Sequence, residues 1–304
     1  MKKWCFRPVD GTQSGLFFLL IGVVSISFAA PFFKLAAPTH PLVSAATRLS
    51  IASVIWWFFI SVQRGVARER VEKMRKGKLV KYACLCGICY AVHFGAWVWS
   101  LGLTSVLTSA TLVTTTPIML GVIGLMSGKD QPNLRLIFSG LVAMAGVALF
   151  TLEGQAGGAG SLQGDGLALL GAFAMVPYLL LSRALGEDMV ISVFSAITTS
   201  VGALCLWSVT WIALPCQDLG VPTQKAFLAL LGAALIPQMI GHSALTLSLK
   251  SRTPTEVGMA TVAEPIGASV LAWILLTETP SLVGVLASVL TLSAVLFALT
   301  SEQN

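Results

Sequence analysis

The sequence predicts an all-α integral membrane protein with ten transmembrane helices, arranged as two inverted five-helix repeats. Three observations favour this fold: an apolar composition, ten long apolar stretches and a one-sided distribution of positive charge. Of the 304 residues, 56% are hydrophobic and 11% are charged, whereas soluble domains are about 45–50% apolar and about 25% charged. The composition argues against a soluble enzyme, a nucleic-acid-binding domain and a disordered scaffold, because too few polar side chains are available to cover a globule.

Ten stretches are long enough to cross a membrane, for which a helix needs about 20 apolar residues. They cover residues 15–37, 42–63, 79–101, 105–127, 134–151, 164–184, 190–214, 225–249, 256–276 and 280–299. The first stretch follows a basic segment, as a signal peptide does. Its apolar run continues well beyond the small residues at 27–29, however, which favours a membrane span over a cleaved signal.

Positive charge lies almost entirely on one side of these ten spans. An even number of spans puts both termini on the same side, and that side carries every one of the 19 Lys and Arg residues except Lys225, Lys34 and Arg48. Lys225 lies in a loop on the opposite side, whereas Lys34 and Arg48 fall within spans. The positive-inside rule therefore predicts that both termini are cytoplasmic. We interpret the net charge of +6 as an orientation signal, so the expected partner is the lipid bilayer and not nucleic acid.

A glycine-rich segment over residues 153–161 divides the chain into two halves of five spans. The predicted organisation is a cytoplasmic N-terminus (1–14), a first five-helix repeat (15–151), a linker (152–163), a second five-helix repeat (164–299) and a tail (300–304). A shift of 148 residues places Thr116-Pro117 on Glu264-Pro265, and Asp130-x-Pro132 on Glu278-x-Pro280. Because five spans are an odd number, the second half enters the membrane from the opposite face, as in transporters with inverted repeats.

Ionisable residues within spans are functional candidates, because a charge in hydrocarbon costs several kcal/mol unless it is paired or hydrated. Glu264 lies near the middle of the ninth span, next to Pro265. It can bind a cation, carry a proton or pair with Arg48; the structural alternative is a buried ion pair or a hydrogen bond to backbone. Arg48 either serves the site or holds outer-loop carbonyls, whereas snorkelling explains Lys34.

Histidine, aromatic and uncharged polar residues provide weaker candidates. His93 and His242 lie well inside spans, although a lone buried histidine usually serves packing. Trp97 either forms an aromatic wall beside His93 or belongs to the outer aromatic belt. Thr116 and Gln238 add polar groups at a similar depth. Four mid-span prolines free backbone carbonyls that hydroxyl groups or a ligand can use, namely Pro117, Pro177, Pro237 and Pro265.

Three local patterns indicate helix capping or helix packing and do not indicate a functional site. Thr253-Pro254-Thr255-Glu256 predicts a capping box at the start of the ninth span, and Thr104-Ser105 a simpler cap at the start of the fourth. Cys84, Cys86 and Cys89 spread over more than one face of a helix, which favours packing over a metal site. Glycines of the fourth and fifth spans predict close helix packing, at positions 121, 124, 128, 140 and 146. No cofactor or metal is expected.

The order and spacing of several short motifs resemble the EamA-type members of the drug/metabolite transporter superfamily over residues 15–299. The motifs are Ala45-Ala46-Thr47-Arg48-Leu49, Thr116-Pro117, Tyr178-Leu179-Leu180-Leu181-Ser182-Arg183, Gly241-His242-Ser243-Ala244, Glu264-Pro265-Ile266-Gly267-Ala268 and Thr277-Glu278-x-Pro280. The resemblance implies two inverted five-helix bundles around a central cavity and alternating access. It also implies export or exchange of small metabolites, such as amino acids, amines, purines, nucleotide-linked compounds or S-adenosylmethionine. Two departures are Ser25-Ile26-Ser27-Phe28 in place of an early Trp-Gly, and Asp130 in place of glutamate.

The sequence therefore predicts a secondary transporter of a small metabolite in the cytoplasmic (inner) membrane, coupled to protons or to exchange, and not an enzyme. One alternative is a channel, although no charged ring or filter motif is present. The other is an intramembrane enzyme. Gly241-His242-Ser243-Ala244 lacks the last glycine of a rhomboid motif, and Asp165 stands without the aspartate cluster of a phosphoalcohol transferase. The metabolite, the direction of transport and the oligomeric state are not indicated.

Overall fold

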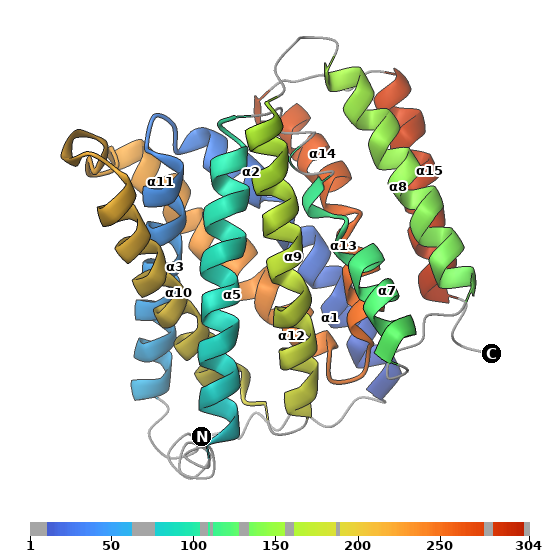
Figure 1. Cartoon of the computed structure of the whole chain (residues 1–304), viewed down its shortest axis with the longest axis horizontal. Helices are drawn as coiled ribbons and strands as arrows, with labels where there is room; N and C mark the ends of the chain where they lie inside the picture. Colours follow the sequence, from blue (N-terminus) through green and yellow to red (C-terminus); the bar gives the residue numbers. More distant parts are fainter. Residues whose placement is uncertain are drawn as a thin grey trace.

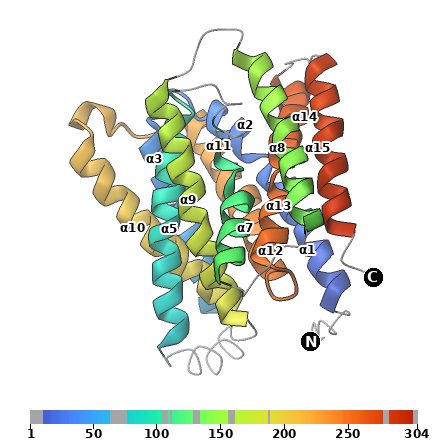
Figure 2. The same cartoon turned by 45° about the vertical axis from the view of Figure 1, so that its right-hand side comes forward.

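The computed structural model describes residues 11–62, 77–103, 109, 112–127, 134–155, 161–186, 189–276 and 282–300. Every regular element within these residues is helical, as predicted. The helices pack side by side in one bundle (Figures 1 and 2). Six helical segments of the described chain are long and apolar enough to cross a membrane: Ser14–Leu35, Pro41–Val62, Lys78–Ser100, Leu162–Leu185, Ile191–Ala213 and Gln224–Ser248.

The helices of the two halves follow the predicted spans closely. Those before the glycine-rich segment are α1 (Gly11–Ile26), α2 (Ala29–Leu35), α3 (Pro41–Val62), α5 (Lys78–Ser100), α7 (Thr116–Ser127) and α8 (Leu134–Gln155). Those after it are α9 (Leu162–Leu185), α10 (Ile191–Ala213), α11 (Gln224–Ala233), η3 (Ala234–His242), α12 (Ser243–Ser248), α13 (Pro254–Thr261), α14 (Glu264–Leu276) and α15 (Leu282–Thr300), with a short 3₁₀ turn, η2 (Cys216–Asp218). η3 is a π-helix.

Three predicted spans are not continuous helices. Turns interrupt them at residues 27–28, 114–115 and 262–263. Each turn lies two to four residues before a proline (Pro31, Pro117 or Pro265), which lacks a backbone donor and crowds the preceding turn. A proline alone does not decide a break, because α9 continues through Pro177 and η3 contains Pro237.

Helix pairs from the two halves make the main contacts of the bundle. α3 packs on α10, α5 on α9 and α10, α8 on α15, α7 on α13, and α1 on η3 and α12. Small residues permit the close approaches: a Cβ added to Gly146 of α8 would collide with Thr291 of α15, and one added to Gly87 would lie 2.6 Å from the Val201 side chain. The prediction of close packing at Gly146 is confirmed. Without a hydrophobic driving force in lipid, such contacts stabilise helix association.

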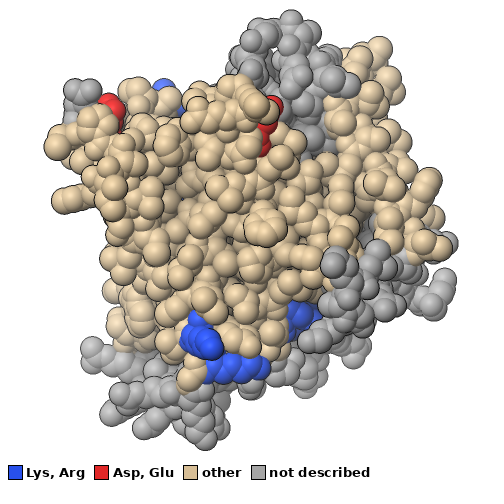
Figure 3. Space-filling view, viewed as in Figure 1, with Lys and Arg blue, Asp and Glu red and all other residues tan. Residues whose placement is uncertain are grey.

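Charged side chains lie at the two ends of the bundle. On the face in Figure 3, the described Lys and Arg residues gather mainly at the lower edge, and a wide band without charged side chains separates them from the upper edge. Lys78, at the start of α5, donates a 3.1 Å hydrogen bond to the carbonyl of Ala184, at the end of α9. The uncharged band has the character expected of a surface in contact with lipid.

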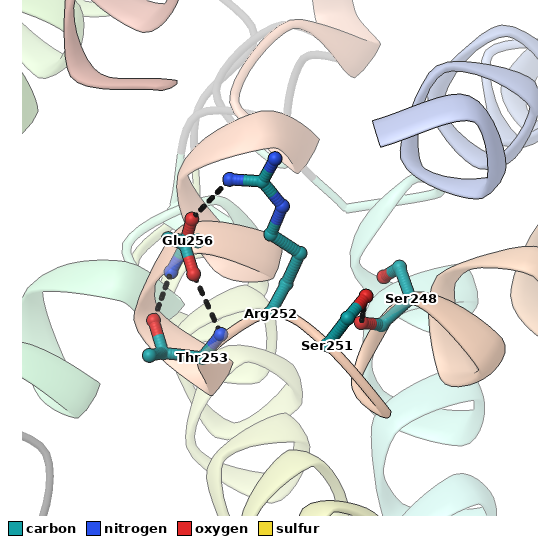
Figure 4. Close-up of polar contacts among 5 residues, drawn as sticks. All are labelled: Ser248, Ser251, Arg252, Thr253 and Glu256. Carbon is teal, nitrogen blue, oxygen red and sulfur yellow. Dashed lines mark hydrogen bonds and ion pairs between the residues drawn. The ribbon is translucent and has the colours of Figure 1, made fainter. Parts of the chain in front are cut away.

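The predicted capping box at the start of α13 is confirmed (Figure 4). The Glu256 backbone N–H donates to the Thr253 hydroxyl at 3.2 Å, and the Glu256 carboxylate accepts from the Thr253 backbone N–H at 2.7 Å. The other oxygen of Glu256 forms a 2.8 Å ion pair with Arg252. Both side chains are buried. The predicted cap at Thr104-Ser105 and the acid-x-Pro motifs at Asp130 and Glu278 lie outside the described residues.

Candidate functional site

A cavity of about 50 Å³ lies between the two halves of the chain. It is lined by residues of α1, the 113–116 region, α5, α9, η3, α12, α13 and α14, which are Ile26, His93, Val113, Thr114, Thr116, Met175, Tyr178, Leu179, His242, Leu245, Val257, Thr261 and Glu264. A cavity needs about 10–15 Å³ to hold one water molecule, whereas pockets for metabolites measure about 300–1,000 Å³. In this conformation the cavity accommodates water-sized molecules, so a metabolite requires the helices to move apart.

Glu264 lines this cavity as the first residue of α14, directly after the turn at 262–263. Its carboxylate makes no hydrogen bond or ion pair with the residues that the structure describes. Its side chain interacts electrostatically with Arg48 but does not contact it as an ion pair. The alternative in which Glu264 pairs directly with Arg48 is therefore not realised in this structure, and the acid faces the cavity without a partner among the described residues.

The two candidate histidines both line the cavity. His93 Nδ1 lies 2.9 Å from the carbonyl of Gly171 in α9, which assigns the proton to Nδ1 and leaves Nε2 as an acceptor. The His242 ring makes edge contacts with the rings of Tyr90 and Phe94, at centroid distances of 5.5 and 5.2 Å. Each histidine therefore packs against neighbouring helices and also borders the cavity.

The sequence did not predict a directional hydrogen-bond chain that lies beside the cavity. Tyr90 donates to the Tyr178 hydroxyl at 2.8 Å, and the Tyr178 and Thr246 hydroxyls lie 2.7 Å apart. Because Thr246 donates to the His242 carbonyl at 2.7 Å, Tyr178 must be the donor to Thr246. The chain joins α5 of the first half to α9 and α12 of the second. The protein has three tyrosines in 304 residues, and two of them meet here. The scarcity of tyrosine was the signal in the sequence that could have drawn attention to this pair.

Arg48 is fully buried in α3, with no exposed side-chain area. Its guanidinium carbon lies 4.4 Å from the centroid of the Phe94 ring and 5.6 Å from that of Phe33. None of its three side-chain nitrogens has a hydrogen-bond acceptor among the described residues. The alternative in which Arg48 binds outer-loop carbonyls or reaches the membrane surface is therefore wrong for the described part of the chain.

Trp97 belongs to the interior, so its interpretation as part of an outer aromatic belt is wrong. Its side chain is 4% exposed. It stacks on His93 at a centroid distance of 6.1 Å and packs against the edge of Phe33 at 5.8 Å. The indole N–H of Trp97 has no acceptor within the described residues. The residue shares both Phe33 and Phe94 as neighbours with Arg48.

Thr116 and Gln238 occupy different surroundings. Thr116 lines the cavity, and its hydroxyl lies 3.1 and 3.2 Å from the carbonyls of Val113 and Ala172. Gln238 is buried in η3, where it lies beside Tyr90 and not on the cavity. The structure thus brings Glu264, His93, His242 and Thr116 together at the cavity and places Arg48, Trp97 and Gln238 behind it.

The cysteines of α5 contribute to packing. Buried Cys86 Sγ lies 3.7 Å from the Ser182 hydroxyl and 3.8 Å from the Tyr178 carbonyl, at the contact between α5 and α9. Among the described residues, no group of three His, Cys, Asp or Glu side chains is arranged to hold a metal ion. The chemistry available at the cavity is therefore that of ionisable side chains, hydroxyl groups and aromatic rings.

Comparison with known proteins identifies the family. The EamA-like transporter family matches this chain twice, at residues 13–152 and 162–300. The chain belongs to the EamA-like transporter family. It is accordingly an integral, multi-pass membrane protein of the drug/metabolite transporter type, in a family of transporters and not of enzymes.

A solved structure has the same fold as this EamA-like protein. It is described only as "Crystal structure of protein", and it superposes with a TM-score of 0.75 at 15% sequence identity. The match covers 94% of this chain and 97% of the other. A search of curated proteins gives no match. The structural likeness establishes a shared fold, and the site of this chain must be interpreted from its own residues.

Proposed function

We propose that this EamA-like protein is a secondary transporter that moves a small metabolite across the cytoplasmic membrane by alternating access. The observation that carries the proposal is Glu264, an acid placed in a cavity between two halves of the bundle and at a break in a helix. Binding sites of secondary transporters are commonly formed where discontinuous helices meet at a repeat interface. The proposed substrates belong to the amino acid, amine, purine or S-adenosylmethionine class.

The helix contacts support ten spans in two inverted repeats. Exchanging the halves maps the pair α3–α10 onto itself, and likewise α7–α13 and α8–α15. The same exchange maps the α5–α9 contact onto the contact of α1 with η3 and α12. The turns at 114–115 and 262–263 are also related by the shift of 148 residues that aligns Thr116 with Glu264. A pseudo-two-fold arrangement explains all these contacts.

The distribution of charge supports cytoplasmic termini. The first turns of α1 and the last turns of α15 lie toward the lower side of the bundle (Figures 1 and 2). That side also carries Lys78, Arg183 and the turn between α12 and α13, which contains Arg252. By the positive-inside rule, we assign this side to the cytoplasm of a cell whose inner membrane holds the protein.

Glu264 is the proposed ionisable site for a proton or a cationic group. An acid in a membrane interior is costly, so its presence without a partner among the described residues favours a transient one. Thr261, at the end of α13, and Glu264 both border the cavity, on the two sides of the turn at 262–263. A movement of α13 against α14 would therefore change the surroundings of the acid directly.

Transport in proteoliposomes tests the proposal. The purified protein should catalyse counterflow of a radiolabelled metabolite found by screening the four substrate classes. Transport by the Glu264→Gln variant should depend much less on pH. We expect the change in transport rate with pH to shrink by roughly 5–150-fold, the usual size of a coupling between two ligands. Thr116→Ser, which keeps a hydroxyl at the matching break, is the control. Unchanged pH dependence in Glu264→Gln would contradict the role of the acid, and the absence of counterflow for every class would contradict transport.

A further inference from the structure

Two buried hydrogen-bond donors converge behind the cavity without acceptors among the described residues. They are the guanidinium of Arg48, from α3, and the indole N–H of Trp97, from α5, and what places them in one region is the pair of aromatic neighbours that they share. Both pack against the rings of Phe33 and Phe94. A buried donor without an acceptor costs free energy, and a buried charge without a partner costs more.

We infer that Arg48 and Trp97 form a subsite for a carboxylate group of the substrate. A guanidinium presents its donors in a planar fork that matches the two oxygens of a carboxylate, and a third donor from an indole adds to that match. The inference rests on the proposed transport function and deepens it. It predicts that the protein distinguishes acids from amines that carry no acid.

The carboxylate subsite (Arg48 and Trp97) lies next to the cavity, and Phe94 connects Arg48 to the histidines that line it. One side of the Phe94 ring carries the guanidinium of Arg48, at 4.4 Å. The ring also contacts His93 and His242, which line the cavity, at centroid distances of 4.7 and 5.2 Å. Phe94 and the two histidines therefore stand between the cavity and Arg48, whereas His93 connects Trp97 to the cavity; a movement of these rings would open the subsite.

The electrostatics of the region favour a carboxylate at Arg48. Arg48 and Glu264 interact electrostatically, yet they do not form an ion pair within the described chain. The remaining titratable groups near Arg48 are Tyr90, His93 and His242, which are uncharged in their ordinary buried forms. No second described cation competes with Arg48 for an anion. Cation–π contact with Phe94 stabilises the guanidinium but leaves its in-plane donors available.

Binding of matched compounds tests the inference on the full-length protein. The probes are triplets of an amino acid, the acid that lacks its amino group and the amine that lacks its carboxyl group: phenylalanine, 3-phenylpropionate and phenethylamine, then leucine, 4-methylpentanoate and isopentylamine, then alanine, propionate and ethylamine. We expect at least one carboxylate-bearing member to bind about 10- to 100-fold more tightly than its amine-only partner, as charge-assisted hydrogen bonds produce. Equal or weaker binding of the acids throughout the series would overturn the inference.

Two variants assign the preference to the named donors. Arg48→Gln should reduce the preference for the acid to within about twofold, whereas Arg48→Lys should retain part of it, because it keeps the charge without the fork. Trp97→Phe keeps an aromatic ring but removes the N–H, so acid binding should weaken several-fold while amine binding stays unchanged. If Arg48→Gln does not fold, Trp97→Phe tests the subsite by itself. A wild-type preference in Trp97→Phe and in a folded Arg48→Gln would overturn the subsite.

Thermal unfolding of the ligand-free protein separates recognition from a structural role. Arg48→Met should leave the melting temperature unchanged or raise it, because replacing an unpaired buried charge with an apolar side chain is neutral or stabilising. A marked fall would show that Arg48 holds the bundle together and would contradict the inference. If Glu264→Gln keeps the wild-type pH dependence of transport, only the proposed proton coupling is contradicted. The preference for a carboxylate is measured by binding and not by transport, so it is tested separately.

Discussion

The broken helices of the two halves carry different chemistry at corresponding positions. In the first half, the turn at 114–115 is followed by Thr116-Pro117; in the second, the turn at 262–263 is followed by Glu264-Pro265. The hydroxyl of Thr116 lies 3.1 Å from the carbonyl of Val113, which Pro117 leaves without its usual donor. An ionised Glu264 cannot donate such a bond. A proline follows both breaks, and the residue directly before it is a hydroxyl donor in the first half and an acid in the second.

The helices that precede the two breaks differ as well. α13 begins with the buried Arg252–Glu256 ion pair, whereas the positions 148 residues earlier are Thr104 and Thr108. α1 packs closely on the turn before α13, since a Cβ added to Gly15 would collide with Ser251. The second half therefore has charged residues both at the start of its broken helix and at the break. Substitutions at each of these positions test the difference from the first half.

The largest effect is expected at the start of α13. Arg252→Met leaves the Glu256 carboxylate buried without its cation, which should reduce the free energy of unfolding by about 3–5 kcal/mol. Chemical or thermal unfolding in detergent measures the loss. The double variant Arg252→Met/Glu256→Gln should recover most of it, because glutamine keeps the capping box without a charge. If the double variant were as unstable as Arg252→Met, the pair would not act as a charge pair.

A carboxylate introduced at the first-half break should destabilise the protein. Thr116→Glu replaces a donor with an acceptor that faces the carbonyls of Val113 and Ala172. We expect a loss of about 3 kcal/mol, near the upper end of the cost of an unsatisfied buried polar group. Glu264→Thr, which reverses the exchange at the second break, should leave the free energy of unfolding unchanged or raise it, because it removes an unpaired acid from the membrane interior. Equal effects of the two changes would show that the breaks are interchangeable.

A smaller effect is expected just after the second break. A Cβ added to Gly267 of α14 would collide with Ser27, at the break between α1 and α2. At the matching position of α7 the first half has Met119, so this close approach belongs to the second half. Gly267→Ala should destabilise the protein by about 1–2 kcal/mol through overpacking. Gly166→Ala in α9 is the control, because a Cβ there meets no atom within 4 Å and should stabilise the helix slightly.

Apolar patterning predicted where helices occur but not where they break. Pro31, Pro117 and Pro265 accompany breaks, whereas Pro177 lies within continuous α9. The difference depends on neighbouring helices that satisfy or crowd the freed carbonyls, and this is not readable from the proline itself. The predicted site residues Glu264, His93, His242 and Thr116 meet at the cavity because each is a polar group placed at mid-span depth.

Tertiary contacts explain what the sequence could not predict about the remaining candidates. Trp97 has the spacing of an interfacial aromatic, yet it turns inward against Phe33 and His93. Tyr90 and Tyr178 lie 88 residues apart and form a stacked, hydrogen-bonded pair only because α5 packs on α9. Periodicity within one helix contains no information about such a partner. Helix packing therefore decides which candidates reach the cavity, and the experiments above test Glu264, Thr116, Arg48 and Trp97.

The π-helix η3 gives the eighth span an internal means of rotation. Its hydrogen bonds connect residues five apart, whereas those of an α-helix connect residues four apart. If Ala234–His242 returned to α-helical pairing, everything after it would turn by about 100°, the angle of one residue in a helix with 3.6 residues per turn. Thr246 would then move away from Tyr178, and the hydrogen bond that joins α12 to α9 would break. One change of pairing within a single helix would thus release α12 from the Tyr90–Tyr178 pair that joins the two halves.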